Sequence, residues 1–71
     1  MQEIVENNIR IILIEYAQGR ESIMHYRPQD GRAKWFRDDL DQLWVKFTFA
    51  DEHHVVPASR VIEVVYNRRP S

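Results

Sequence analysis

The chain has 71 residues, with 10 Lys and Arg against 11 Asp and Glu, so its formal net charge is −1. Its hydrophobic fraction of 44% and charged fraction of 30% are those of a globular domain and exclude a disordered or strongly basic chain. We expect one small domain over residues 1–71 with a frayed tail at 67–71, and the absence of cysteine excludes disulfides and thiolate metal sites.

The first predicted element is a β-strand over residues 9–16, which is dense in isoleucine and ends in tyrosine. Both of its alternating faces are apolar, which is typical of a central or doubly covered strand. A helix is the alternative, because Ile4 and Val5 would extend it. The turn signal at 18–20 favours the strand and predicts a hairpin with a returning strand at 21–27.

A turn is predicted at residues 28–31, because Pro28 presets φ and Gly31 accepts a positive φ. Residues 32–44 are ambiguous. Their large apolar side chains recur near helical spacing, and an aspartate at the start could cap a helix, so we predict a short helix or helical turn at about 38–43. The alternative is a strand at 34–37 followed by a loop.

Residues 45–49 alternate cleanly between apolar and polar side chains and predict a half-buried strand. A polar turn follows, and two further strands are predicted at 54–56 and 61–66. The expected fold is therefore mostly β: a small curved five-stranded sheet or barrel with one short helix or helical turn.

The segment Val55-Val56-Pro57-Ala58-Ser59-Arg60-Val61-Ile62-Glu63-Val64 resembles the end of an SH3-like barrel. There, a strand runs into a single helical turn that contains proline and serine, and then into the terminal strand. The resemblance covers about ten residues and implies a fold, not a function.

The most suggestive segment is 25–37, where cations alternate with aromatic residues. Single-stranded nucleic acid is held by such a combination, with cations on the backbone and rings against the bases. The candidate nucleic-acid or partner-binding residues are Arg20, Tyr26, Arg27, Arg32, Lys34, Trp35 and Arg37. Tyr26 or Phe36 would be the stacking ring. The competing interpretation is that Trp35 and Phe36 fill the core.

Catalytic chemistry has little support in the sequence. Asp51, Glu52, His53 and His54 could suggest a metal site, but adjacent histidines on a strand point to opposite faces. Aspartates 38, 39 and 41 lack the spacing of a calcium loop. No nucleophile motif or phosphate-cradling glycine loop is present. We therefore expect no enzyme, no metal and no cofactor.

Taken together, these features predict a small non-catalytic binding module that contacts a protein partner or a second copy of itself. The alternative is binding of single-stranded RNA or DNA through residues 25–37. A cytoplasmic location is expected, because small secreted domains usually carry disulfides. No membrane contact is expected, because no apolar run approaches the roughly 20 residues that span a bilayer.

Overall fold

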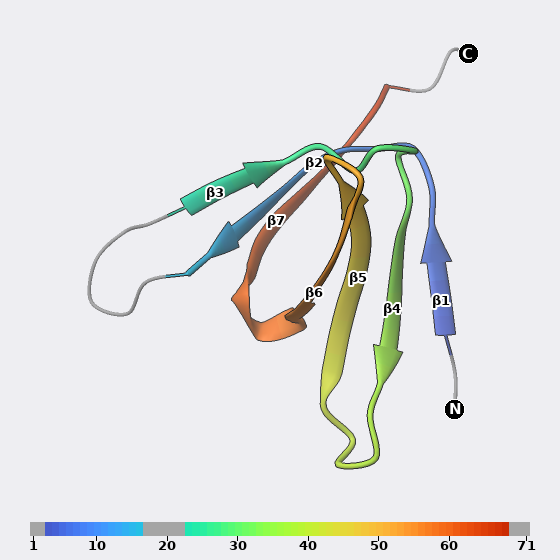
Figure 1. Cartoon of the computed structure of the whole chain (residues 1–71), viewed down its shortest axis with the longest axis vertical. Helices are drawn as coiled ribbons and strands as arrows, with labels where there is room; N and C mark the ends of the chain where they lie inside the picture. Colours follow the sequence, from blue (N-terminus) through green and yellow to red (C-terminus); the bar gives the residue numbers. More distant parts are fainter. Residues whose placement is uncertain (1–2, 17–22, 69–71) are drawn as a thin grey trace.

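The computed structural model describes residues 3–16 and 23–68, which form seven β-strands and one 3-10 turn, with no α-helix among them (Figure 1). In chain order the elements are β1 (Glu3–Glu6), β2 (Ile9–Glu15), β3 (Ile23–Tyr26), β4 (Ala33–Arg37), β5 (Leu43–Phe49), β6 (Glu52–Pro57), η1 (Ala58–Arg60) and β7 (Val61–Tyr66). The mostly β prediction is confirmed. None of the described residues belongs to a helix long and apolar enough to cross a bilayer.

The strands form two antiparallel sheets. One has the order β1-β4-β5-β6 and the other β3-β2-β7. Five strands were expected, and the two additional ones are β1 and β4. The hairpin expected at 18–20 lies outside the described residues, although β2 and β3 do pair, with Ile12 opposite Tyr26.

The helix predicted at 38–43 is wrong, and the alternative of a strand followed by a loop is what the chain adopts. Asp38 turns the chain: its Oδ1 accepts the backbone N–H groups of Leu40 and Gln42, both at 2.9 Å. The Asp38 N–H donates to the Gln42 carbonyl at 2.9 Å, and Asp41 has a φ of 64°. A left-handed residue at this position cannot continue a helix, so β4 and β5 meet through a tight turn.

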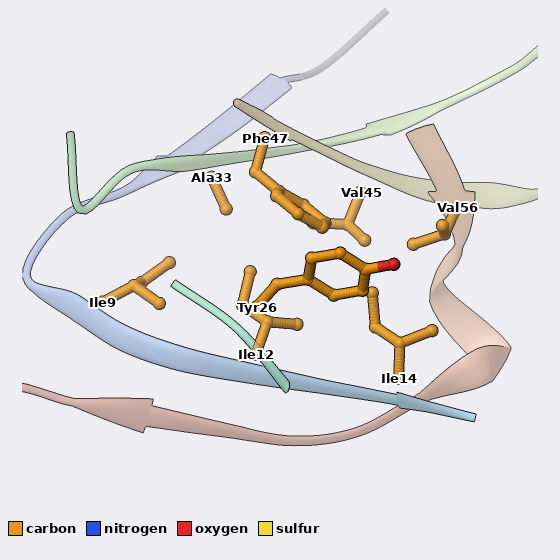
Figure 2. Close-up of a cluster of buried hydrophobic side chains, with 8 residues drawn as sticks. All are labelled: Ile9, Ile12, Ile14, Tyr26, Ala33, Val45, Phe47 and Val56. Carbon is orange, nitrogen blue, oxygen red and sulfur yellow. The ribbon is translucent and has the colours of Figure 1, made fainter. Parts of the chain in front are cut away.

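The core lies between the two sheets (Figure 2). Its eight buried side chains are Ile9, Ile12, Ile14, Tyr26, Ala33, Val45, Phe47 and Val56. Ile9 and Ile12 both point inward although they are an odd number of positions apart, because the pairing of β2 with β7 shifts register between Ile9 and Ile11. A bulge of this kind reverses the alternation and lets one strand bury more apolar side chains.

The end of the chain has the succession that its resemblance to an SH3-like barrel predicts: β6, the 3-10 turn η1, and β7. The arrangement of the sheets is compatible with such a barrel. The turn predicted at 28–31 is also present: the Gly31 N–H donates to the Pro28 carbonyl at 3.0 Å, and Gly31 has a φ of 71°. Asn67, expected to begin a frayed tail, donates its N–H to the Asn8 carbonyl at 2.7 Å.

Candidate nucleic-acid interface

The outer face of the four-stranded sheet carries two lysines and two aromatic residues in register. Val45 and Phe47 of β5 are buried, so Trp44 and Lys46, which alternate with them, point away from the core. In the ladder between β4 and β5, Lys34 lies opposite Lys46, and Phe36 lies opposite Trp44. These four side chains, in two neighbouring rows, are called here the lysine–aromatic face.

The neighbouring strands extend both rows. Val5 of β1 lies beside Lys34, and Val55 of β6 lies beside Lys46. Glu3 and Pro57 flank the aromatic row in the same way. The carboxylate of Glu3 lies 3.7 Å from the Lys34 ammonium, so Lys34 is partly neutralised. Hydrophobic side chains therefore frame the lysine pair on both sides.

A hydrogen bond holds the Trp44 ring at one end of the face. Its indole Nε1–H donates to Asp38 Oδ2 at 2.8 Å. This bond, with the backbone N–H groups of Gln42 and Leu40, holds the pKa of the Asp38 carboxyl below its usual range. A fixed ring loses little conformational entropy when a ligand stacks on it, so Trp44 is preorganised as a platform.

The other end of the face is a shallow hollow of about 340 Å³. The polar and charged side chains around it are those of Asp30, Arg32, Lys34, Lys46, Thr48 and His53. Four of these six are basic groups. The hollow therefore presents more positive than negative charge, although the whole chain has a net charge of −1.

Hydrogen bonds fix the turn at 28–31 against the hairpin between β5 and β6. Gln29 donates its Nε2–H to Asp51 Oδ1 and accepts the Asp51 N–H on Oε1, both at 3.0 Å. Its own N–H donates to the Thr48 carbonyl at 2.7 Å. This clamp brings Arg32, which follows the turn, to the same hollow as His53.

The structure divides the residues predicted at 25–37 among several surfaces. Arg32 and Lys34 lie at the hollow on the outer face. Trp35 and Arg37 lie on the opposite side of β4, where they line a separate groove. Arg37 donates to the Asp41 carbonyl at 2.9 Å. Of the seven predicted residues, only Arg32 and Lys34 therefore share the hollow on the outer face.

Three further members of the predicted set lie elsewhere. Tyr26 is buried in the core at 9% exposure, so it cannot act as a stacking ring, and that expectation is corrected. Arg27 lines a different hollow beside Arg10. Arg20 lies outside the described residues. Trp35 packs against the core, whereas Phe36 is half-buried on the outer face, so neither ring is fully buried.

Sequence reasoning missed Trp44 and Lys46 as members of the site. A signal was available, because 34 and 46, like 36 and 44, are symmetric about residue 40. A β-hairpin centred there pairs these residues. The helix predicted at 38–43 concealed this symmetry.

The adjacent histidines point to opposite faces, as strand alternation predicts. His53 lies outside, with Nδ1 at 3.4 Å from the Thr48 hydroxyl. His54 lies inside, stacked on Phe47 with ring centroids 5.4 Å apart. Within residues 3–16 and 23–68, no three acidic or histidine side chains are placed to hold one metal ion.

No protein-family model matches this chain, and comparison with the curated proteins and with the solved structures gives no match.

Proposed function

We propose that this protein binds single-stranded nucleic acid on the lysine–aromatic face and has no catalytic step of its own. The observation that carries this function is the register of β4 and β5, which sets a pair of cations beside a pair of half-buried rings on the outer face. Bases stack on aromatic rings without strong sequence preference, and ammonium groups contact phosphates. The face supplies both types of group.

The two rows have a spacing that suits this task. Residues two apart on a strand lie about 7 Å from one another, so a ring and an ammonium on the same strand can contact one base and a nearby phosphate. Lys34 lies beside Phe36 on β4, and Lys46 lies beside Trp44 on β5. Each strand thus offers one ring and one cation.

A second hollow of about 410 Å³ extends the basic surface beyond the sheet. It includes Arg10 and Arg27, and it shares Asp30 with the hollow at the lysine pair. A strand of nucleic acid that crosses the face could continue over the turn at 28–31. We therefore expect affinity to increase with oligonucleotide length beyond the two nucleotides that the rings can stack.

We place this function in the cytoplasm, where a chain without cysteine needs no disulfide for its stability and where RNA is abundant.

The test maps the face that contacts the oligonucleotide and measures how binding depends on salt. The chain has two tryptophans, and they lie on opposite faces of the sheet, so Trp35→Phe leaves only Trp44 as a fluorescent reporter. A mixed-sequence single-stranded oligonucleotide should quench Trp44 strongly at low salt. In the variant Trp44→Phe, the same oligonucleotide should leave the fluorescence of Trp35 nearly unchanged.

Charge variants provide the matched control. Lys46→Gln removes a cation from the lysine–aromatic face, whereas Arg37→Gln removes one from the opposite side of the same sheet. Each phosphate contact on a single strand contributes about 0.7 to the slope of log affinity against log salt. Lys46→Gln should lower both affinity and slope, and Arg37→Gln should alter neither. Equal effects of the two variants, or binding insensitive to salt, would overturn the assignment.

A further inference from the structure

The first strand has an edge that no other strand covers in the described part of the chain. β1 pairs with β4 on one side only, as the end strand of its sheet. Ile4 and Val5 are 62% and 52% exposed. An uncovered edge presents unpaired backbone N–H and C=O groups, which are a template for another extended chain.

Two hollows adjoin this strand. One, of about 430 Å³, lies on the inner face of the sheet between Ile4, Trp35 and Leu43. Another, of about 490 Å³, follows residues 4–8 towards Tyr66. Glu6 lines both of them. A chain added to β1 would therefore find space for a side chain on the inner face of the sheet.

The end of β7 borders the second of these hollows. The Tyr66 hydroxyl donates to Glu6 Oε2 at 2.6 Å, and the Asn67 N–H donates to the Asn8 carbonyl at 2.7 Å. These bonds hold β7 against the end of β1. β7 is itself the end strand of the second sheet.

Charge identifies the occupant. The sequence of β1 is Glu-Ile-Val-Glu, with a carboxylate at each end. A second copy that paired antiparallel over all four residues would set Glu3 opposite Glu6 twice, and like charges in direct opposition are destabilising. The complementary segment has a basic residue opposite each glutamate and apolar residues between them.

We infer that β1 binds an extended peptide segment of the pattern basic–apolar–apolar–basic, which adds to the sheet as an antiparallel strand. Backbone hydrogen bonds to the edge supply affinity, and alternate side chains supply specificity. The apolar residue opposite Ile4 faces inward and enters the hollow at Trp35. The apolar residue opposite Val5 covers the outer side. This edge adjoins the lysine–aromatic face through Glu3 and Val5, but the inference rests on the open edge of β1 and does not depend on nucleic-acid binding.

The probe is a short capped peptide with the central sequence Lys-Val-Leu-Lys, and its control is the same peptide with Glu-Val-Leu-Glu. Both are titrated into the full-length 15N-labelled chain. The basic peptide should shift the amide signals of residues 3–6 and the indole signal of Trp35, with an affinity at least roughly tenfold above that of the acidic peptide. Shifts confined to other strands, or equal affinity for both peptides, would overturn the inference.

A charge reversal on β1 tests whether the two glutamates determine which peptide binds. The double variant Glu3→Lys with Glu6→Lys should exchange the preference, so that the acidic peptide binds more tightly. Glu63→Lys, an exposed carboxylate on β7, is the matched control and should leave the preference unchanged. Thermal unfolding of each variant confirms that it is folded. A dimer that forms with rising concentration and protects the amides of β1 would instead identify a second copy as the occupant and overturn the peptide.

Discussion

Replacing Lys46 with glutamine should stabilise the fold while weakening nucleic-acid binding. Lys46 lies directly opposite Lys34 on an antiparallel ladder, where the Cβ atoms of a pair are about 5 Å apart. Lys34 has a carboxylate at 3.7 Å, that of Glu3. Among the described residues, no carboxylate lies within 4 Å of the Lys46 ammonium. Removing the Lys46 charge therefore relieves repulsion without leaving an ion pair broken.

The expected gain is small but measurable. Cross-strand pairs of charges contribute roughly 0.2–1 kcal/mol, and the exposed position of Lys46 favours the lower half of that range. In a domain of this size, 1 kcal/mol shifts the midpoint of thermal unfolding by about 4–8 °C. We therefore expect a rise of about 1–4 °C at low salt. In 1 M salt the Debye length falls to about 3 Å, and the difference from the wild type should disappear.

The assay pairs calorimetry with fluorescence anisotropy of a labelled single-stranded oligonucleotide. Lys46→Arg, which retains the charge, is the control and should show neither the rise in midpoint nor the loss of affinity. If Lys46→Gln lowered the midpoint at low salt, the two lysines would not repel each other and the described register would carry no electrostatic strain. If it stabilised the fold but bound the oligonucleotide as the wild type does, the lysine pair would have no part in binding.

Three further predictions concern single groups. Trp44→Phe removes the hydrogen-bond donor to Asp38, so the pKa of that carboxyl should rise towards 3.8 and the variant should be less stable than the wild type at neutral pH. Urea titrations should show this difference in the free energy of unfolding shrinking as pH falls below 3.8, because protonation of Asp38 removes the same contribution from the wild type. Burial, and to a smaller extent the neighbouring Tyr26 hydroxyl, raises the pKa of Tyr16 to about 12. The neutral Tyr16 hydroxyl therefore contributes stability below pH 10, and this contribution is lost as pH rises towards 12. In Tyr26→Phe, the phenolate absorbance should show Tyr16 titrating at a lower pH than in the wild type. Ala50 and Asp51, with φ angles of 53° and 63°, form the two-residue turn between β5 and β6, and Ala50→Asn should raise the free energy of unfolding in urea by about 0.5 kcal/mol, because asparagine tolerates the left-handed region better than alanine.

The strands that could be predicted are those in which the alternation of apolar and polar side chains shows which face is buried. In β5, buried Val45 and Phe47 alternate with outward-facing residues, and this alternation is visible in the sequence. The strand β1 could not be predicted in this way. Its four residues are too few to show a period, and it is held by its pairing with β4, which is distant in the sequence.

The error at 38–43 has a local cause. An aspartate before a run of helix-compatible residues is equally suited to capping a helix and to closing a turn, because its carboxylate accepts backbone N–H groups in both. The turn prevails because β4 pairs with β5 over four residue pairs. Tertiary pairing of this kind overrides the weak preference of a six-residue stretch for helix.

The candidate site could be predicted only in part, for the same reason. Lys34 and Arg32 were identified from the basic character of their segment. Lys46 and Trp44 join them only through the ladder, and a register cannot be deduced from composition. Tyr26 was misassigned because an aromatic residue among cations has the same sequence signature whether its ring is buried or exposed.

The placement of Trp44 argues that the outer face of the sheet has a task other than stability. A small domain buries only about 60% of the surface of its unfolded chain, so a large ring has most value in the core. Here the core rings are Tyr26 and Phe47, while Trp44 lies outside, held by a carboxylate beside an opposed pair of lysines. Because β5 alternates between these two environments, changes at Val45 or Phe47 should act on stability alone, changes at Trp44 on both stability and ligand affinity, and changes at Lys46 mainly on ligand affinity. The like-charge pair of Lys34 and Lys46 left in register costs stability, and the anionic ligand that we propose would compensate for it.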